Sequence, residues 1–332
     1  MSISIAMVAL GKGGKISASK FRDVWTSSWP GAPVPSKPEK KDNTVSFRVG
    51  DADIIYGLMP APIPWSDLEG PCATSWLWPD ASEQLRSHTK HVIVTVSSDA
   101  SAIERARILT QATSVLLACC DAAIGVLWCT STVVMPSKMF QDFAVEMLPD
   151  HPTPYIWVDF RAGPGEEGKT SGFTSGLSEL GLMDMETSNS PEPPGELRDR
   201  FFGLATYLIE NGLVIQDGNT IGESAEEQIR IDYVDSSFGH QGKVMRLDYE
   251  AAEVSGDGLK MTPYGCAHAI ATAVVTLLIG AGIFSALSGV ISSAVLRVII
   301  LVIPLLIFGF ILMVISDKIL NNLFGLQAFR DD

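Results

Sequence analysis

The sequence lacks several patterns that mark catalytic or metal-binding proteins. Its five cysteines include no Cys-x-x-Cys pair, so neither a disulfide framework nor a zinc site is predicted. There is also no Gly-x-Ser-x-Gly elbow of the kind that presents a nucleophilic serine. The segment Met1 to Lys12 has a short apolar run but no basic leader and no small-residue cleavage site. We therefore expect it to form a first strand, in a protein that faces a reducing cytoplasm.

Positive charge is scarce. The 332 residues include 24 Lys and Arg against 38 Asp and Glu, which gives a formal net charge of -14. From Tyr264 onward the two signs balance, so the excess of negative charge lies before that residue. An acidic surface repels nucleic acid phosphates and anionic lipid headgroups. We therefore expect no nucleic acid partner, and we expect any attachment to a bilayer to be hydrophobic.

Long apolar runs are confined to the C-terminal part. His268 to Leu296 has no ionisable side chain except the histidine, Val298 to Ile315 has none, and Arg297 separates the two runs. One straight helix over both would be about 70 Å long at about 1.5 Å per residue, more than twice a hydrocarbon core of about 30 Å. The pattern therefore predicts a two-helix transmembrane hairpin at 264–318, with lipid contact through 267–316 and a short tail at 319–332.

The flanking charges predict how this hairpin is oriented. Lys260, Lys318 and Arg330 lie on the side of the preceding domain and Arg297 lies in the turn, which favours an inner membrane with the domain in the cytoplasm. The first apolar run also carries small residues at every fourth position: Ala281, Ser285, Gly289 and Ser293. Such a ladder lets another helix approach closely, so it is a candidate surface for packing or homo-oligomerisation, although small residues are common in such helices.

Residues 1–250 are predicted to form a soluble α+β domain with a mixed or antiparallel sheet and packed helices. This domain is either one piece or two subdomains of about 1–160 and 170–250. A linker at 251–263 follows it. The predicted strands include Ser2 to Leu10, Thr44 to Val49, Asp53 to Met59, His91 to Ser97, Ala123 to Val134, Tyr155 to Phe160, Leu213 to Asp217, Gln228 to Val234 and Val244 to Leu247. The predicted helices include Ile16 to Trp29, Ala102 to Cys120 with Ser101 as its N-cap, Phe140 to Met147 and Glu196 to Asn211.

One segment fits the pattern of a phosphate-binding loop. Gly163 to Thr170 reads Gly, four residues, then Gly168-Lys169-Thr170, so Lys169 would contact phosphate and Thr170 would ligate magnesium. Two glutamates inside the loop would face a triphosphate, however, and the residues that follow lack the period of the required helix. A solvent-exposed acidic loop is the favoured interpretation.

The remaining candidates are weaker. Asp184 and Glu186 alternate along a predicted strand and, with Asp217, are candidate catalytic carboxylates, although a solvated strand face is the favoured interpretation of the first two. His88 and His91 have no third ligand in reach, so a surface pair is favoured over a metal site. Trp65, Trp76 and Trp78 flank the proline-rich segment Pro60 to Trp65 and are expected to hold it against the core, with a pocket lining as the alternative.

Three motifs carry a resemblance to a known family. Thr174 to Gly176 with Leu180 to Glu186, then Ala205 to Leu208 ending at Gly212, and then the turn Asp217 to Gly222 resemble the bacterial family catalogued as domain of unknown function 4261. Met59 to Trp65 and the strand after His91 look like the companion N-terminal part of longer members, so the resemblance covers most of residues 1–235. It implies a fold without an established reaction, and the membrane hairpin is an addition to it.

These patterns favour a membrane-anchored, non-enzymatic binding or regulatory protein that presents an acidic surface to a protein partner. No cofactor and no metal are expected. The alternative is an enzyme that binds nucleotide through Lys169 and Thr170, or a hydrolase that uses Asp184, Glu186 and Asp217.

Overall fold

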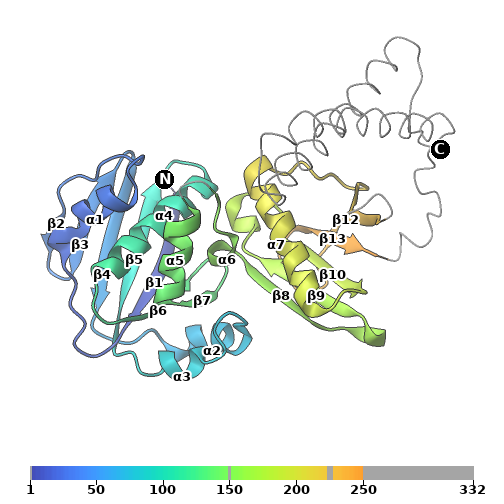
Figure 1. Ribbon diagram of the computed structural model, residues 1–332, viewed down its shortest axis with the longest axis horizontal. Coiled ribbons are helices and arrows are strands. Elements are labelled where there is room, and N and C mark those ends of the chain that lie inside the picture. Colours follow the sequence, from blue (N-terminus) through green and yellow to red (C-terminus); the bar gives the residue numbers. More distant parts are fainter. Residues whose placement is uncertain (1, 149–150, 223–226, 250–332) are drawn as a thin grey trace, which may run out of the picture. The chain divides into compact units, whose positions relative to one another are not determined.

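A computed structural model describes residues 2–148, 151–222 and 227–249 (Figure 1). The predicted linker, transmembrane hairpin and tail, including the small-residue ladder, lie outside these described residues. Within the described ranges, no helix is both long and apolar enough to cross a membrane.

The first sheet has seven strands in the order β2-β3-β4-β5-β1-β6-β7, and each neighbouring pair is antiparallel. Its strands are β1 Ser2–Leu10, β2 Glu39–Lys41, β3 Thr44–Val49, β4 Ala52–Met59, β5 Lys90–Ser98, β6 Ala123–Trp128 and β7 Val133–Pro136. Successive side chains of a strand point to opposite faces. On β1, Val8 accordingly enters the main core, whereas Ala9 enters a smaller core on the other face.

Helices cover both faces of this sheet. The main core lies under α1 Phe21–Ser28, α4 Ala102–Ala118 and α5 Ser137–Met147. The smaller core lies under α2 Trp65–Thr74 and α3 Ala81–Leu85, with Trp78 at its centre. The N-cap predicted for α4 is confirmed, because the Ser101 hydroxyl accepts a hydrogen bond from the Glu104 N–H at 3.2 Å.

The second sheet has six strands in the order β11-β12-β13-β10-β9-β8. They are β8 Asp159–Pro164, β9 Thr170–Ser175, β10 Met185–Ser190, β11 Thr220–Ile221, β12 Ile229–Asp235 and β13 Lys243–Asp248, and α7 Pro194–Asn211 packs on β8 and β9. The pair β10 and β13 is parallel and the other pairs are antiparallel. The predicted α+β class with antiparallel and mixed sheets is therefore confirmed.

Both sheets belong to one compact unit that spans Met1–Ile221 and Gln228–Ala252. The strands of the first sheet end at Pro136 and those of the second begin at Asp159. One hydrophobic core nevertheless runs through both, from Val8 of β1 to Leu247 of β13. The division into subdomains 1–160 and 170–250 stays a prediction.

Two predicted strands are wrong in part. The segment predicted as Tyr155 to Phe160 begins instead as the short helix α6, Pro154–Trp157, because proline at the first helical position presets the backbone for a helical turn. The Trp157 indole N–H donates to Oγ1 of Thr110 at 2.8 Å and holds this turn against α4. The segment Leu213 to Asp217 is irregular and leads into a turn at Asp217 and Gly218; it is not a strand.

Two other predicted elements have different bounds. The helix expected over Ile16 to Trp29 starts only at Phe21, after the 3-10 turn Ala18–Lys20. The strand expected over Ala123 to Val134 is two strands, β6 and β7, because the chain turns at Thr132, whose φ of 59° lies in the left-handed region.

Candidate functional site

The second sheet presents a polar face built by the alternation of β12 and β13. Ile231 and Leu247 are buried in the main core. Their neighbours Arg230, Asp232, Arg246 and Asp248 belong to the opposite face. The β12–β13 register places Arg230 beside Asp248 and Asp232 beside Arg246, so each cross-strand pair joins opposite charges.

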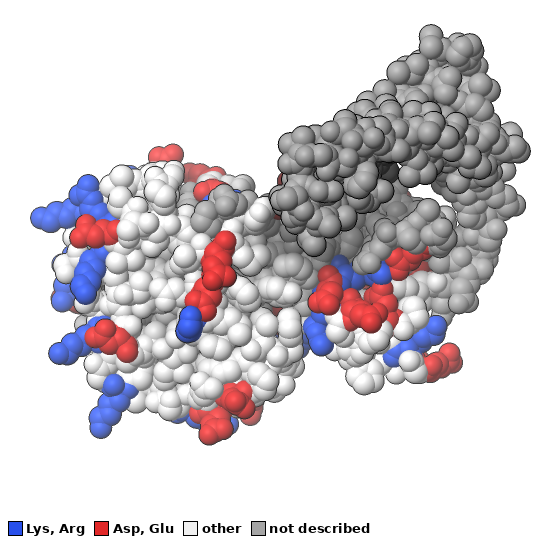
Figure 2. All heavy atoms as spheres, in the orientation of Figure 1, with Lys and Arg blue, Asp and Glu red and all other residues white. Residues whose placement is uncertain are grey.

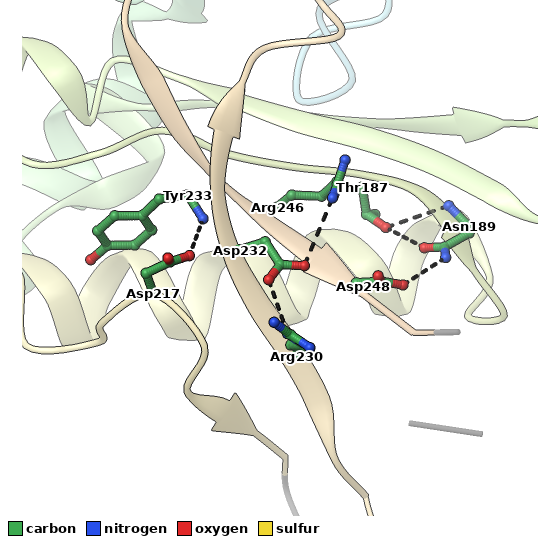
Figure 3. A network of polar contacts seen from close by, with 8 residues as sticks. All are labelled: Thr187, Asn189, Asp217, Arg230, Asp232, Tyr233, Arg246 and Asp248. Carbon is green, nitrogen blue, oxygen red and sulfur yellow. Dashed lines mark hydrogen bonds and ion pairs between the residues drawn. The ribbon is translucent and has the colours of Figure 1, made fainter. Parts of the chain in front are cut away.

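Hydrogen bonds and an ion pair connect these side chains in two neighbouring groups (Figure 3). Oδ1 of Asp232 accepts from Nε of Arg230 at 2.9 Å, and its Oδ2 lies 3.7 Å from Nη2 of Arg246. On the other side of β13, Nδ2 of Asn189 donates to Asp248 at 3.2 Å. We name this set the polar ladder, and its members are Thr187, Asn189, Arg230, Asp232, Arg246 and Asp248.

Exposure differs between the two signs of charge in the polar ladder. The side chains of Arg230 and Arg246 are 54% and 40% exposed, whereas that of Asp232 is 20% exposed. The Asp232 carboxylate is thus engaged by two guanidinium groups, and those groups keep open edges with N–H donors. Such an arrangement suits binding of a carboxylate, phosphate or carbonyl group better than proton transfer by the aspartate.

Asp184 is buried and bonded within its own loop. It is 2% exposed. Oδ1 accepts from Oγ1 of Thr174 and the N–H of Leu177, both at 3.0 Å, and Oδ2 accepts from the Oγ and N–H of Ser178 at 2.7 and 3.2 Å. These bonds hold the 3-10 turn Ser178–Leu180, which connects β9 to β10. The carboxylate therefore has a structural role in this geometry.

Glu186 is also buried, at 1% exposure, and it bonds to a segment fifty residues away. Oε2 accepts from the Ser236 hydroxyl at 2.7 Å, and Oε1 accepts from the Ser237 N–H at 3.0 Å. The interaction fastens the end of β12 to β10. The predicted solvated strand face is thus wrong for both carboxylates, because nearby donors cover Asp184 and donors from a distant segment cover Glu186.

Asp217 lies apart from these contacts. It is exposed, and its Oδ1 accepts from the Tyr233 N–H at 2.7 Å (Figure 3). This negative charge, together with burial as the larger cause, raises the pKa of the Tyr233 hydroxyl. The three candidate carboxylates thus bond to three different sets of partners.

The segment Gly163 to Thr170 forms a β-hairpin turn. Pro164 at the end of β8 pairs with Thr170 at the start of β9, and Gly165 N–H donates to the carbonyl of Lys169 at 2.9 Å. The Thr170 hydroxyl donates to the Glu192 carbonyl and is buried. A phosphate-binding loop needs a helix N-terminus after its Lys-Thr pair, whereas a strand follows here. Gly163, Gly168, Lys169 and Thr170 therefore lack the strand-loop-helix setting of that motif.

His88 and His91 are buried, at 7% and 6% exposure, so the prediction of a surface pair is wrong. Ile63 N–H donates to Nε2 of His88 at 2.7 Å, and Nδ1 of His91 lies 2.8 Å from the Ala61 carbonyl. Both histidines thus fasten the proline-rich segment that precedes α2. Burial lowers the pKa of His91, since desolvation disfavours its charged form.

The three tryptophans have three different surroundings. Trp78 is 4% exposed and packs with Ile63 in the smaller core, as expected for a side chain that holds the proline-rich segment. Trp65 carries the guanidinium of Arg86 over its ring at 3.7 Å. Trp76 is 38% exposed, and its ring meets that of Tyr155 at 5.9 Å between centroids.

Metal binding gains no support from the described ranges, in which no group of three or more His, Cys, Asp or Glu is placed to hold an ion. The polar ladder was not predicted from the sequence. Its signal was present in the alternation Ile229-Arg230-Ile231-Asp232 and Met245-Arg246-Leu247-Asp248. The opposite charges at paired positions become visible only once the strand register is known.

The described chain is thus an α+β protein whose second sheet carries a polar, ion-paired face. Residues 173–248 match the model of the family described as Domain of unknown function (DUF4261). This range includes the whole polar ladder and Asp184, Glu186 and Asp217. It supports the resemblance for the second sheet, whereas the resemblance of the N-terminal part stays a prediction. No curated protein and no solved structure matches the chain.

Proposed function

We propose that this chain is a membrane-anchored binding or regulatory protein without enzymatic activity, whose α+β domain faces the cytoplasm and contacts a protein partner. The observation that carries the proposal is the state of the candidate carboxylates. Asp184 accepts hydrogen bonds from the loop before β10, and Glu186 accepts them from the segment after β12. Asp217 accepts from the Tyr233 N–H. Asp232, in the polar ladder, is held between two arginines. Carboxylates held in this way are poorly placed to act as general bases.

The polar ladder is the surface we propose for the partner. Arginine is enriched among residues that dominate protein interfaces, and the open guanidinium edges of Arg230 and Arg246 suit an acidic or carbonyl-rich segment. The anchor is proposed from the two apolar runs His268 to Leu296 and Val298 to Ile315.

Partner binding is testable by photo-crosslinking in living cells. A photoreactive amino acid at position 235, whose side chain is 88% exposed at the end of β12, should give a discrete protein adduct. Arg246→Glu should abolish the adduct, whereas Arg48→Glu, an equal charge change on the first sheet, should leave it intact. An adduct that survives Arg246→Glu would remove the polar ladder as the partner surface.

Anchoring needs a separate measurement. The full-length chain should stay in the membrane fraction after an alkaline carbonate wash, and the double variant Leu278→Asp with Leu306→Asp should be released, because each charge is costly in hydrocarbon. Release of the unaltered chain would contradict the anchor without affecting the partner surface.

The enzymatic alternative predicts nucleotide binding through the hairpin turn. We expect Mg-ATP to bind the full-length chain and its Lys169→Ala variant equally weakly in equilibrium dialysis, because the turn precedes a strand. Tight, magnesium-dependent binding that is lost in Lys169→Ala would overturn the proposal in favour of a nucleotide-binding enzyme.

A further inference from the structure

A cleft of about 430 Å³ opens where β4 ends and β5 begins, between the loop that follows β1 and the turn joining β2 to β3. Its volume falls in the range of roughly 300 to 1,000 Å³ that is typical of small-molecule sites. It lies in the first sheet, away from the polar ladder and outside the segment that matches the family.

The floor of this cleft is hydrocarbon. Ile16, Val45 and Leu58 line it and are partly buried, and they pack on the core that includes Phe21, Tyr56 and Val92. The Tyr56 hydroxyl donates to the Ala112 carbonyl at 2.8 Å, so the core beneath the floor offers no free hydroxyl group to a ligand. A sugar or a nucleobase would leave polar groups unpaired on such a floor, whereas an alkyl chain would not.

The rim of the cleft is basic. Lys15 and Lys40 line it from its two sides and are exposed, and Asp42 is the single acidic residue among the described lining residues. The wider segment 12–48 has eight basic residues (Lys12, Lys15, Lys20, Arg22, Lys37, Lys40, Lys41 and Arg48) against three acidic ones (Asp23, Glu39 and Asp42). Figure 2 shows Lys and Arg gathering along the edge of the molecule where β2 and β3 lie.

This local excess of positive charge contrasts with the net charge of -14 of the whole chain. Clefts lined by one sign of charge concentrate ligands of the opposite sign. A metal cation or a cationic ligand is disfavoured at this rim, and a carboxylate or phosphate group is favoured. The floor and the rim together therefore require an apolar body with an anionic end.

We propose that this cleft binds a single-chain anionic amphiphile, with its hydrocarbon chain on the floor formed by Ile16, Val45 and Leu58 and its carboxylate or phosphate at Lys15 and Lys40. The site goes beyond the proposed partner binding and does not depend on the membrane anchor.

Photoaffinity labelling tests this assignment. The full-length chain is labelled with decanoate that carries an aliphatic diazirine, in phosphatidylcholine nanodiscs or, where the chain purifies without lipid, in buffer. Mass spectrometry should place the adducts in the segments around Ile16, Val45 and Leu58. Unlabelled decanoate should compete, and decanol, which has the same chain without the charge, should compete roughly tenfold less well.

Matched variants distinguish the effect of the two rim lysines on binding from the effect of the overall charge of the surface. Lys15→Glu with Lys40→Glu should weaken decanoate binding by roughly tenfold or more, whereas Lys12→Glu with Lys37→Glu, which changes the net charge equally on exposed residues outside the lining, should leave it unchanged. Ala18→Trp should reduce labelling without any charge change, because it fills the cleft. Equal losses in both lysine pairs, equal competition by decanol, or adducts outside the cleft would each overturn the proposal.

The amphiphile has two sources, a free acid or a membrane lipid, and the nanodisc composition distinguishes them. Addition of phosphatidylglycerol should displace the probe if the ligand comes from the bilayer, and should leave labelling unchanged if it is a free acid. In either case unlabelled decanoate should compete at the same adduct positions, and a failure of decanoate to compete there would overturn the anionic cleft. Failure of the membrane anchor would leave the labelling in buffer unaffected.

Discussion

Asp184 accepts four hydrogen bonds, three from its own loop and one from Thr174 of β9, and this explains why an acidic side chain is buried beside the second sheet. These donors would lose their acceptor if the carboxylate were removed. The residue thus resembles a backbone cap more than a catalytic base.

Asp184→Asn should therefore lower the free energy of unfolding by about 2 to 3 kcal/mol, because the amide places an N–H against donors. Asp217→Asn is the control, since Asp217 is exposed and accepts one bond, and it should cost about 1 kcal/mol or less. Urea unfolding followed by tryptophan fluorescence measures both. Equal effects in the two variants would contradict a structural role for Asp184.

Histidine burial predicts a pH dependence of stability. The pKa of His91 is lowered from 6.5 by burial, so below pH 6.5 the unfolded chain binds more protons at this residue than the folded chain. Its contribution to stability is complete above about pH 6.5 and is lost as the pH falls through the lowered folded pKa. The melting temperature should thus fall between pH 7 and pH 5, and His91→Gln should reduce this dependence.

His151→Gln serves as the comparison, because it removes a histidine whose side chain is 69% exposed. Parallel pH profiles for the unaltered chain and the His91→Gln variant would contradict the assignment to His91.

The sequence could identify these residues but not their surroundings. Glu186 alternates with Asp184 as a solvated strand would, but Ser236 and Ser237 cover it from fifty residues further along the chain. His88 and His91 likewise look like an exposed polar pair in the sequence. In the structure the proline-rich segment bonds to both and covers them. Burial by distant segments leaves no local periodicity, so a pattern-based prediction favours exposure.

At the scale of elements, predictions succeeded where the periodicity was strong. The strands expected at Gln228 to Val234 and Val244 to Leu247 became β12 and β13, and the helix expected at Glu196 to Asn211 became α7. The prediction of a strand at Tyr155 to Trp157 was wrong because apolar and aromatic residues suit a strand as well as a short helix. In the structure they form a helical turn. The stacking of Tyr155 on Phe202, with centroids 4.1 Å apart, is a tertiary contact that outweighs strand propensity.

Gly176 shows why the glycine-rich segment around β9 is required. Its φ is 122°, and an added Cβ would lie 2.5 Å from the Trp157 carbonyl oxygen and 2.8 Å from Cβ of Ser131. Gly176→Ala should therefore cost about 3 kcal/mol or more of unfolding free energy. Gly203→Ala in α7 is the control: nothing lies within 4 Å of its added Cβ, and alanine should stabilise the helix by up to about 1 kcal/mol. Thermal denaturation of both variants distinguishes these outcomes, and a tolerated Gly176→Ala would contradict the packing.

At the scale of the whole chain, the sequence separates an acidic part from an apolar, charge-balanced one. The small-residue ladder in the apolar part predicts association of chains in a bilayer. Gly289→Leu should reduce the cross-linked dimer several-fold, because the larger side chain keeps helices apart. Gly280→Leu, which lies on the opposite side of the predicted helix from Gly289, should leave the dimer intact. Unchanged cross-linking in Gly289→Leu would remove the ladder as an association surface.

The strand order of the second sheet has a consequence for biosynthesis. The last strand, β13, lies between β10 and β12 and not at an edge. A growing chain that has emerged only as far as Asp235 therefore has two separate pieces, β8-β9-β10 and β11-β12, each with unpaired backbone groups. Only when Asp248 has emerged can the pieces join, and His268 then follows within about twenty residues. The second sheet is thus completed at about the time when the apolar runs are synthesised. Until β13 has emerged, the unpaired edges of β10 and β12 are exposed to other chains.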